Sequence, residues 1–76
     1  MYHHNVDDIY LTIAKNIKRY RRLKGMTQKE LAIRCGYSYS YIRKLEAPNI
    51  KKCFSIEIIF NISKALEIDI WKLFTD

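Results

Sequence analysis

The sequence predicts an all-α protein, a compact five-helix bundle built around one small core. Its 76 residues are 49% hydrophobic, which is enough for a globular core and too much for a disordered chain. Two glycines and one proline are few interruptions, which favours helices over a turn-rich β fold. Apolar residues recur every three or four positions, the spacing of amphipathic helices. We therefore expect one domain over residues 1–76, with residues 1–6 as a flexible tail.

The first helix is expected to run to about Lys24. Asp7 or Asp8 can cap its N-terminus, and Gly25 is expected to end it. Its buried stripe is formed by Val6, Tyr10, Ile13, Ile17 and Tyr20. The opposite side is basic and carries Lys15, Lys18, Arg19 and Arg22. Positive charge near the end of a helix also suits the helix dipole, so this charge alone does not indicate a ligand.

A second helix is predicted at about residues 28–35. Thr27 and Glu30 have the spacing of a capping box, in which each side chain accepts a hydrogen bond from the other residue's backbone N–H. The buried face of this helix is formed by Leu31, Ala32 and Cys35. Gly36 follows, where the end of a helix favours a left-handed backbone conformation that glycine adopts without steric cost.

A third helix is predicted at about residues 39–46, with Ser38 as its N-cap. Its inward positions are Ile42 and Leu45, and its outward positions are Tyr39, Ser40, Arg43 and Lys44. Ala32 is small where the second and third helices have to cross closely. The two helices are therefore expected to form a tightly packed pair.

Two further helices are expected after Pro48, which ends the third. Ser55 can cap the fourth helix, whose predicted core face is Ile56, Ile59, Ile62 and Leu66. Ile58 and Phe60 lie off this face, so the fourth helix is either buried on several sides or used in an interface. Asp69 can cap a last short helix over residues 70–74.

Six residues of the second and third predicted helices carry a resemblance to a known family: Gln28, Ala32, Gly36, Ile42, Leu45 and Glu46. In this order and spacing they resemble the lambda-repressor-like (Cro/repressor, Xre-type) helix-turn-helix regulators, over roughly residues 13–74. The resemblance implies a five-helix DNA-binding domain in which residues 39–46 form the recognition helix. The family favours glycine at the positions of Pro48 and Glu67, so the backbone is expected to differ at both places.

The charge pattern favours a surface that faces a polyanion. Residues 15–52 contain twelve Lys and Arg against two Glu, a net charge of +10, whereas the rest of the chain carries −4. The alternative is a generally basic surface that maintains solubility. Together with the resemblance, this pattern predicts double-stranded DNA as the partner.

Three outward residues of the predicted recognition helix are expected to read bases. A major groove admits one α-helix, and side chains near its N-terminus reach the base edges. Lys44 can donate to guanine O6 and N7, whereas Ser40 can donate or accept and so specifies little. Tyr39 can contact a base, a phosphate or a thymine methyl group.

A second set of residues is expected to contact the DNA backbone: Gln28, Tyr41, Arg43, Asn49, Lys51 and Lys52. By the resemblance, Gln28 binds a phosphate at the N-terminus of its helix, where free N–H groups favour anions. Tyr41 is undecided between the DNA backbone and the flank of the first helix, and Tyr37 is expected only to pack. For each lysine, simple solvation is the alternative.

Glu46 predicts an internal ion pair. A carboxylate in the last turn of a helix opposes the helix dipole and needs a cationic partner to offset the cost. Arg21, near the end of the first helix, is the candidate, and the resemblance implies the same pairing. The pair is expected to fix the recognition helix against the first helix.

The predicted function is a sequence-specific DNA-binding transcriptional regulator, a Cro-like repressor or controller protein, which binds a pseudo-palindromic operator as a homodimer. The dimer is expected to form through apolar residues of the last two helices: Ile58, Phe60, Ile70 and Trp71. If the N-terminal extension of the first helix covered these residues, the protein would be a monomer. The alternative function is an antitoxin or other protein-interaction module, in which DNA binding is secondary.

Other classes of function receive little support. Both histidines precede residue 6, and no Cys/His or Ser/His/Asp arrangement suits catalysis, so no enzyme and no catalytic residue are expected. Cys35 and Cys53 lack the spacing of a metal site, and neither a cofactor nor a small-molecule ligand is expected. The chain has no run of about 18 apolar residues and no recognisable secretory signal, so a cytoplasmic protein without a membrane span is predicted.

Overall fold

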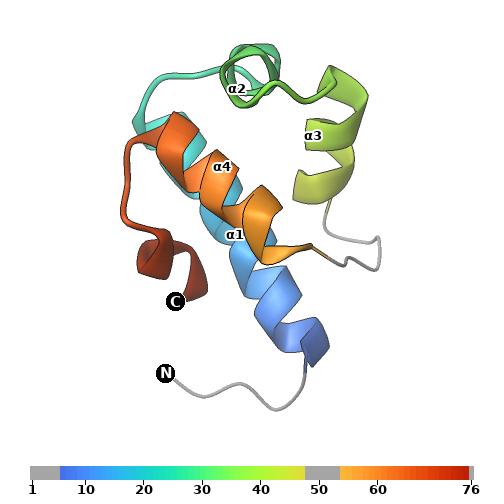
Figure 1. Ribbon diagram of the computed structural model, residues 1–76, viewed down its shortest axis with the longest axis vertical. Helices are drawn as coiled ribbons and strands as arrows, with labels where there is room; N and C mark the ends of the chain where they lie inside the picture. The colour runs from blue at the N-terminus through green and yellow to red at the C-terminus, as the bar shows by residue number, and fades with distance from the viewer. Residues whose placement is uncertain (1–5, 48–53, 76) are drawn as a thin grey trace.

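The computed structural model describes residues 6–47 and 54–75, and all regular structure in these two segments is helical (Figure 1). Four α-helices and one 3₁₀-helix follow one another: α1 (Val6–Leu23), α2 (Gln28–Cys35), α3 (Tyr39–Glu46), α4 (Ile56–Leu66) and η1 (Ile70–Phe74). The all-helical prediction is confirmed, but the fifth predicted helix is a short 3₁₀ segment rather than an α-helix. Within the described segments, no helix is long and apolar enough to cross a membrane.

The helices form two groups (Figure 1). α4 packs on α1 in the middle of the molecule, and η1 packs against both of them. α2 and α3 pack on each other at one end, where α2 also contacts α4 and α3 also contacts α1. The pair α2–α3 is therefore held from one side, and its other side lies at the surface.

The start of α1 differs from the prediction. The helix already includes Val6, so Val6 does not belong to a tail, and residues 1–5 of the expected tail lie outside the described residues. Asp7 and Asp8 consequently lie in the first turn rather than at the N-cap. There their negative charges still favour the helix, because the first turn exposes unpaired N–H groups. At the other end, Gly25 adopts a left-handed conformation with φ of 70°.

The turn between α2 and α3 forms as the sequence predicted. Glu30 N–H donates to Thr27 Oγ1 and Thr27 N–H donates to Glu30 Oε1, which completes the capping box. Gly36 ends α2 with φ of 78°, and its N–H donates to the carbonyl of Ala32. The Ser38 hydroxyl then caps α3 by accepting from the N–H of Tyr41 at 3.1 Å. Local hydrogen bonds therefore fix both ends of this turn.

The core joins all five helices. Its fully buried apolar side chains are Ile13, Ile17, Leu31, Ile42, Ile62, Leu66 and Leu73. The predicted core position Ile56 is wrong, because this side chain is 68% exposed. The buried stripe of α4 includes Ser63, whose hydroxyl donates to the carbonyl of Phe60. Because the stripe passes through Ser63, Ile56 in the first turn lies at its edge.

A buried amide ties the C-terminal segment to α1. The Nδ2 atom of Asn16 donates to the carbonyls of Leu73, at 2.9 Å, and Thr75, at 2.6 Å. Asp69 has the backbone conformation of an N-cap, but its side chain makes no capping hydrogen bond, so its predicted role as a cap is wrong. A backbone hydrogen bond from Lys72 N–H to the carbonyl of Asp69 holds the first turn of η1 instead.

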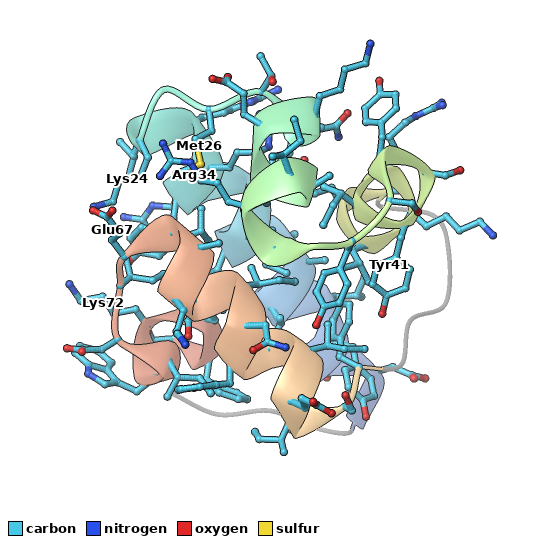
Figure 2. All side chains as sticks on the ribbon, turned by 45° about the horizontal axis from the view of Figure 1, so that its top comes forward. Lys24, Met26, Arg34, Tyr41, Glu67 and Lys72 are labelled. Atoms are coloured by element: carbon cyan, nitrogen blue, oxygen red, sulfur yellow. The ribbon has the colours of Figure 1, made fainter. Side chains whose placement is uncertain are left out.

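Glu67 ends α4 in a conformation that favours glycine. Figure 2 labels Glu67 at the end of α4. Its φ and ψ are 58° and 44°, and it is the one non-glycine residue with positive φ in the described part of the chain. The N–H of Ile68 reaches back to the carbonyl of Ser63, the pattern of a left-handed helix end. The turn thus keeps the geometry expected for glycine although glutamate occupies it.

We predict that Glu67→Gly stabilises the fold. A left-handed conformation costs a residue with a Cβ atom about 1–2 kcal/mol, and glycine avoids this cost. Glycine also loses more conformational entropy on folding, so the free energy of unfolding should rise by only about 0.5–1 kcal/mol. Thermal unfolding followed by circular dichroism should then show an increase of a few degrees. The control Glu67→Ala removes the carboxylate but keeps Cβ. An equal increase in both variants would assign the effect to charge instead of backbone conformation.

Candidate nucleic-acid interface

An ion pair inside the protein connects α1, the following turn and α3. Arg21 Nε and a second guanidinium nitrogen donate to the two carboxylate oxygens of Glu46, at 2.7 and 2.9 Å. The third guanidinium nitrogen donates to the carbonyl of Met26 at 2.8 Å. This two-pronged geometry constrains direction as well as distance. The last turn of α3 is therefore fixed relative to the last turn of α1.

Both charges of this pair are buried. Arg21 is 8% exposed and Glu46 is 7% exposed. The side chain of Gln28, the first residue of α2, also donates from Nε2 to Glu46 Oε1 at 3.1 Å. A buried carboxylate that accepts three hydrogen bonds is well compensated for its lost hydration. Gln28 thus joins α2 to the same network, a contact that the sequence analysis did not foresee.

The outward face of α3 is polar and cationic. Ser40, Arg43 and Lys44 are exposed, and with Ala47 they line a shallow surface hollow of about 250 Å³. Ile42 and Leu45 lie on the opposite side of the helix, in the core. The structure therefore brings the predicted residues Ser40, Arg43 and Lys44 together on one accessible surface.

Tyr39 lies at the start of α3 between two cations. Lys29 Nζ and Arg43 Cζ are 5.4 and 5.5 Å from the centre of its ring. Both distances fall within the range of a cation–π contact. The exposed ring therefore orients two positive side chains from different helices, and Lys29 is a residue to which the sequence analysis gave no role.

The two other tyrosines of this region pack inward. Tyr37 and Tyr41 are partly buried against the core, with ring centres 5.5 Å apart in an edge-to-face arrangement. The hydroxyl of Tyr37 accepts from Asn61 Nδ2 at 3.0 Å, which supports the expectation that it packs. Burial, with a smaller contribution from Tyr37, raises the pKa of the Tyr41 hydroxyl, so this group stays neutral and able to donate.

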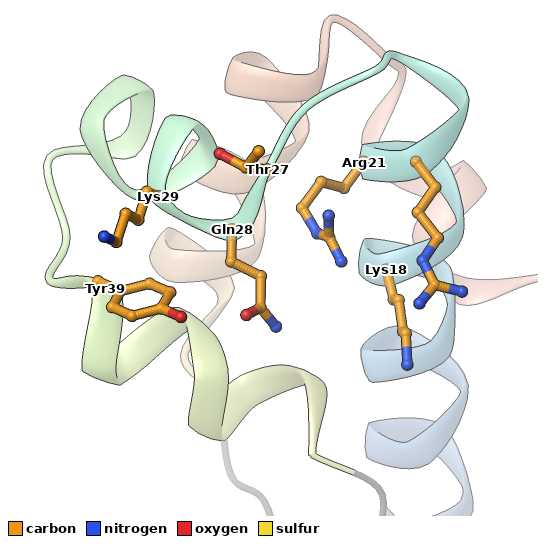
Figure 3. Close-up of a pocket in the computed structure, with 7 residues that line it drawn as sticks. Lys18, Arg21, Thr27, Gln28, Lys29 and Tyr39 are labelled. Carbon is orange, nitrogen blue, oxygen red and sulfur yellow. The ribbon is translucent and has the colours of Figure 1, made fainter.

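A second, larger hollow lies where the end of α1 meets the starts of α2 and α3. Its volume is about 440 Å³. The lining residues are Lys18, Arg21, Arg22, Thr27, Gln28, Lys29 and Tyr39. Figure 3 shows Lys18 and Arg21 on the α1 side, with Lys29 and Tyr39 opposite and Gln28 between them. In the sequence, Lys18 and Arg22 could be recognised only as members of the basic side of the first helix.

The remaining predicted residues fall into two groups. Asn49, Lys51 and Lys52 lie outside the described residues. Of the predicted dimer residues, Phe60 is 49% and Trp71 57% exposed, whereas the other two, Ile58 and Ile70, are partly buried against the core.

Among the described residues, no group of three or more His, Cys, Asp and Glu is placed to hold a metal ion. Burial raises the pKa of the Cys35 thiol to about 11, so this thiol is protonated at neutral pH. A protonated thiol is neither a nucleophile nor a metal ligand.

α2 and α3 are two short helices joined by a glycine turn, and α3 is buried on one side and cationic on the other. This arrangement defines a helix-turn-helix protein. Residues 17–70 match the family described as Helix-turn-helix. The chain belongs to the lambda-repressor-like, Xre-type branch of these proteins.

Two curated relatives agree with this assignment. The HTH-type transcriptional regulator SlrR of Bacillus subtilis (strain 168) is 32% identical over 62 residues, which are 82% of this chain and 40% of SlrR. The HTH-type transcriptional regulator SinR of Bacillus licheniformis is 31% identical over 64 residues, which are 84% of this chain and 57% of SinR. The chain therefore spans about half the length of these relatives.

Solved structures show the same arrangement of helices. The restriction-modification controller protein C.AhdI from Aeromonas hydrophila is 26% identical with a TM-score of 0.77, over 86% of this chain and 96% of that chain. The biofilm master regulator SinR, in a complex with DNA, is 32% identical with a TM-score of 0.75, over 83% of this chain and 98% of that chain.

We predict strong energetic coupling between Arg21 and Glu46. Removing either partner leaves the other charge buried without compensation, so Arg21→Ala and Glu46→Ala should each lower the free energy of unfolding by about 3–5 kcal/mol. The double variant should lose clearly less than the sum of the two single losses. Urea unfolding of the four proteins measures the cycle. Arg22→Ala, which removes an exposed neighbouring charge, serves as the control, and purely additive losses would contradict the coupling.

Proposed function

We propose that this chain is a sequence-specific DNA-binding transcriptional regulator that inserts α3 into the major groove. The observation that carries the proposal is the exposed face of α3, where Ser40, Arg43 and Lys44 point away from a core-anchored helix. The likeness to SinR, which has been solved in complex with DNA, supports the same function. In this proposal residues 1–76 form one DNA-binding domain that acts in a cytoplasmic setting and has no catalytic role.

The proposed base-reading residues are Lys44, Ser40 and Tyr39. Lys44 has a flexible ammonium group that can donate to guanine O6 and N7, which makes it the strongest discriminator. Ser40 adds a weaker contact because a hydroxyl both donates and accepts. Tyr39 is proposed to present its ring edge to the groove while its faces remain in contact with Lys29 and Arg43.

The proposed DNA-backbone contacts are Gln28, Tyr41, Arg43, Asn49, Lys51 and Lys52. Gln28 donates one amide hydrogen to Glu46 and retains a second one for a phosphate oxygen at the N-terminus of α2. Tyr41 contributes a neutral hydroxyl, and Arg43 contributes a guanidinium next to the base-reading face.

We further propose a homodimer that reads a pseudo-palindromic operator, as a Cro-like repressor or a controller protein would. One small domain contacts few base pairs, whereas two copies related by a twofold axis place two recognition helices about 34 Å apart. Phe60 and Trp71 are exposed aromatic residues on α4 and η1, away from α3, which makes them the proposed centre of the interface.

The same exposed aromatic residues favour one alternative. An antitoxin or other interaction module would use Phe60 and Trp71 to bind a different protein, with DNA binding secondary. Co-purification of a stoichiometric partner with the wild type, but not with Trp71→Ala, would favour this alternative over the homodimer.

Selection of bound sequences from random duplex DNA should yield one preferred motif, and Lys44→Ala should relax the choice at one base pair of it. Loss of a bidentate contact should cost about 1–3 kcal/mol on the preferred site and much less on unrelated DNA. Fluorescence anisotropy with both duplexes measures the two affinities. Arg34→Ala, on the side of α2 that faces α4, is the control with the same change in charge. Equal losses of specific and non-specific affinity in Lys44→Ala would reduce Lys44 to a backbone contact.

Sedimentation should show a concentration-dependent dimer of the wild type that Trp71→Ala dissociates. Trp71 is more than half exposed, so its removal should leave the circular dichroism spectrum and the unfolding transition nearly unchanged. Ile33→Ala is the matched control, because Ile33 is also exposed but lies on α2. A wild type that stays monomeric at high micromolar concentration, with and without DNA, would eliminate the dimer.

A further inference from the structure

A separate surface hollow lies between α2 and α4, and none of the proposed DNA contacts lines it. Its volume is about 240 Å³. The lining residues are Arg34, Cys35, Asn61, Lys64 and Ala65. All of them belong to α2 or α4, and none belongs to α3. The proposed DNA contacts therefore do not account for this hollow.

Two positive side chains from different helices meet here. Arg34 comes from the last turn of α2 and Lys64 from the last turn of α4, and both are exposed. A cation in the last turn suits the helix dipole, which accounts for one on each helix but not for their convergence on one hollow. No Asp or Glu of the described residues lines the hollow, and Glu30 and Glu67, the nearest in sequence, form no ion pair with either cation. The hollow therefore has a local excess of positive charge.

The floor of the hollow is small, uncharged and poorly hydrated. Cys35 and Ala65 are partly buried and pack against the core. Burial raises the pKa of the Cys35 thiol to about 11, as expected where little water reaches the sulfur. Water screens a charge pair above such a floor less than one on an open surface. A carboxylate is therefore bound more strongly here than at an isolated surface lysine.

Asn61 adds a hydrogen-bond acceptor. Its Nδ2 donates to the hydroxyl of Tyr37 at 3.0 Å, which sets the orientation of the amide. Its Oδ1 accepts no hydrogen bond from the described residues. A phosphate or a phosphodiester needs donors alone, whereas a polypeptide brings N–H groups that need an acceptor as well. The combination of two cations with an amide oxygen therefore favours a polypeptide as the ligand.

The dimensions and the rim also favour a protein segment. The volume is below the range of about 300–1,000 Å³ that is typical of small-molecule pockets, so the hollow suits one or two side chains of a partner. At its edge the ring of Phe60 is 49% exposed, and Lys64 Nζ lies 5.5 Å from the ring centre. An apolar side chain next to a carboxylate can cover this ring. The surface thus fits a segment in which acidic and apolar residues are neighbours.

We propose that the hollow between α2 and α4 is a docking site for an acidic segment of a partner protein. A carboxylate of the segment binds between Arg34 and Lys64, its backbone donates to Asn61, and an apolar neighbour packs on Phe60. The site shares only Phe60 with the proposed dimer interface and does not depend on the proposed DNA binding. Because the outer face of α3 stays available, one molecule can hold DNA and the partner at the same time.

The experiment selects ligands for the 76-residue chain from random peptides of about twelve residues displayed on phage. Enriched peptides should carry Asp or Glu beside an apolar residue. A fluorescein-labelled synthetic peptide of the enriched sequence is then titrated by anisotropy. Arg34→Ala and Lys64→Ala should each weaken its binding about tenfold, because a charge that binds in a partly dehydrated hollow contributes more than one on the rim of an interface.

The matched control is Lys15→Ala/Lys24→Ala on α1. It removes two positive charges from exposed positions outside the hollow, as many as Arg34→Ala/Lys64→Ala removes inside it, and should keep the wild-type affinity. Arg34→Lys/Lys64→Arg keeps both charges and should retain most of the binding. Since Lys64 also contacts Phe60, Arg34→Ala alone tests the hollow without altering the proposed dimer interface.

Four results would overturn the docking site: no acidic sequence is enriched, Arg34→Ala binds the peptide as the wild type does, the α1 control loses as much affinity as the double variant, or a DNA duplex competes with the peptide. Self-association of the wild type that Arg34→Ala abolishes would also overturn it, because the occupant would then be a second copy of the chain. Peptide binding is measured without DNA, so a failure of the proposed DNA-binding function would leave this test intact.

Discussion

The buried ion pair between Arg21 and Glu46 is the constraint on which the geometry of this protein depends. It joins α1 to the end of α3, and the same guanidinium holds the carbonyl of Met26 in the turn that leads to α2. Gln28 extends the network to the first residue of α2. These hydrogen bonds are directional and the groups that form them are largely buried. A small rotation of α3 would therefore break several of them at once. A rigid α3 suits the proposed role of its outer face, which has to match base edges.

Around this fixed frame, short-range interactions decide which side chains reach the surface. The capping box at Thr27 and the left-handed Gly36 set the angle between α2 and α3, so Ile42 and Leu45 enter the core. The opposite face of α3 then has to be exposed, and its residues are polar or cationic. Tyr39 connects this face to the cations at the start of α2. Three cations of α2 and α3, Lys29, Arg43 and Lys44, therefore lie around Tyr39 and along the outer face of α3.

The C-terminal part of the chain is organised by different interactions. Asn16 binds two carbonyls near the C-terminus, and Leu73 inserts into the core, so η1 is anchored without a side-chain cap of its own. Glu67 accepts a strained conformation to place this segment against α1 and α4. Trp71 remains largely outside the core that Leu73 enters. This arrangement separates the proposed assembly surface from the proposed DNA surface.

Local sequence patterns determined most of the helices and the turn between α2 and α3, because capping residues, glycine and apolar spacing act over only a few residues. The Arg21–Glu46 pair was also predictable, since a carboxylate at a helix end demands a cation. Tertiary structure alone decided the burial of Ser63 in place of Ile56, the contact of Gln28 with Glu46, and the meeting of Lys18 and Arg22 with Lys29 around one hollow. These features depend on how separate helices are rotated against one another, and that rotation is set by the packing of the whole core rather than by any single segment.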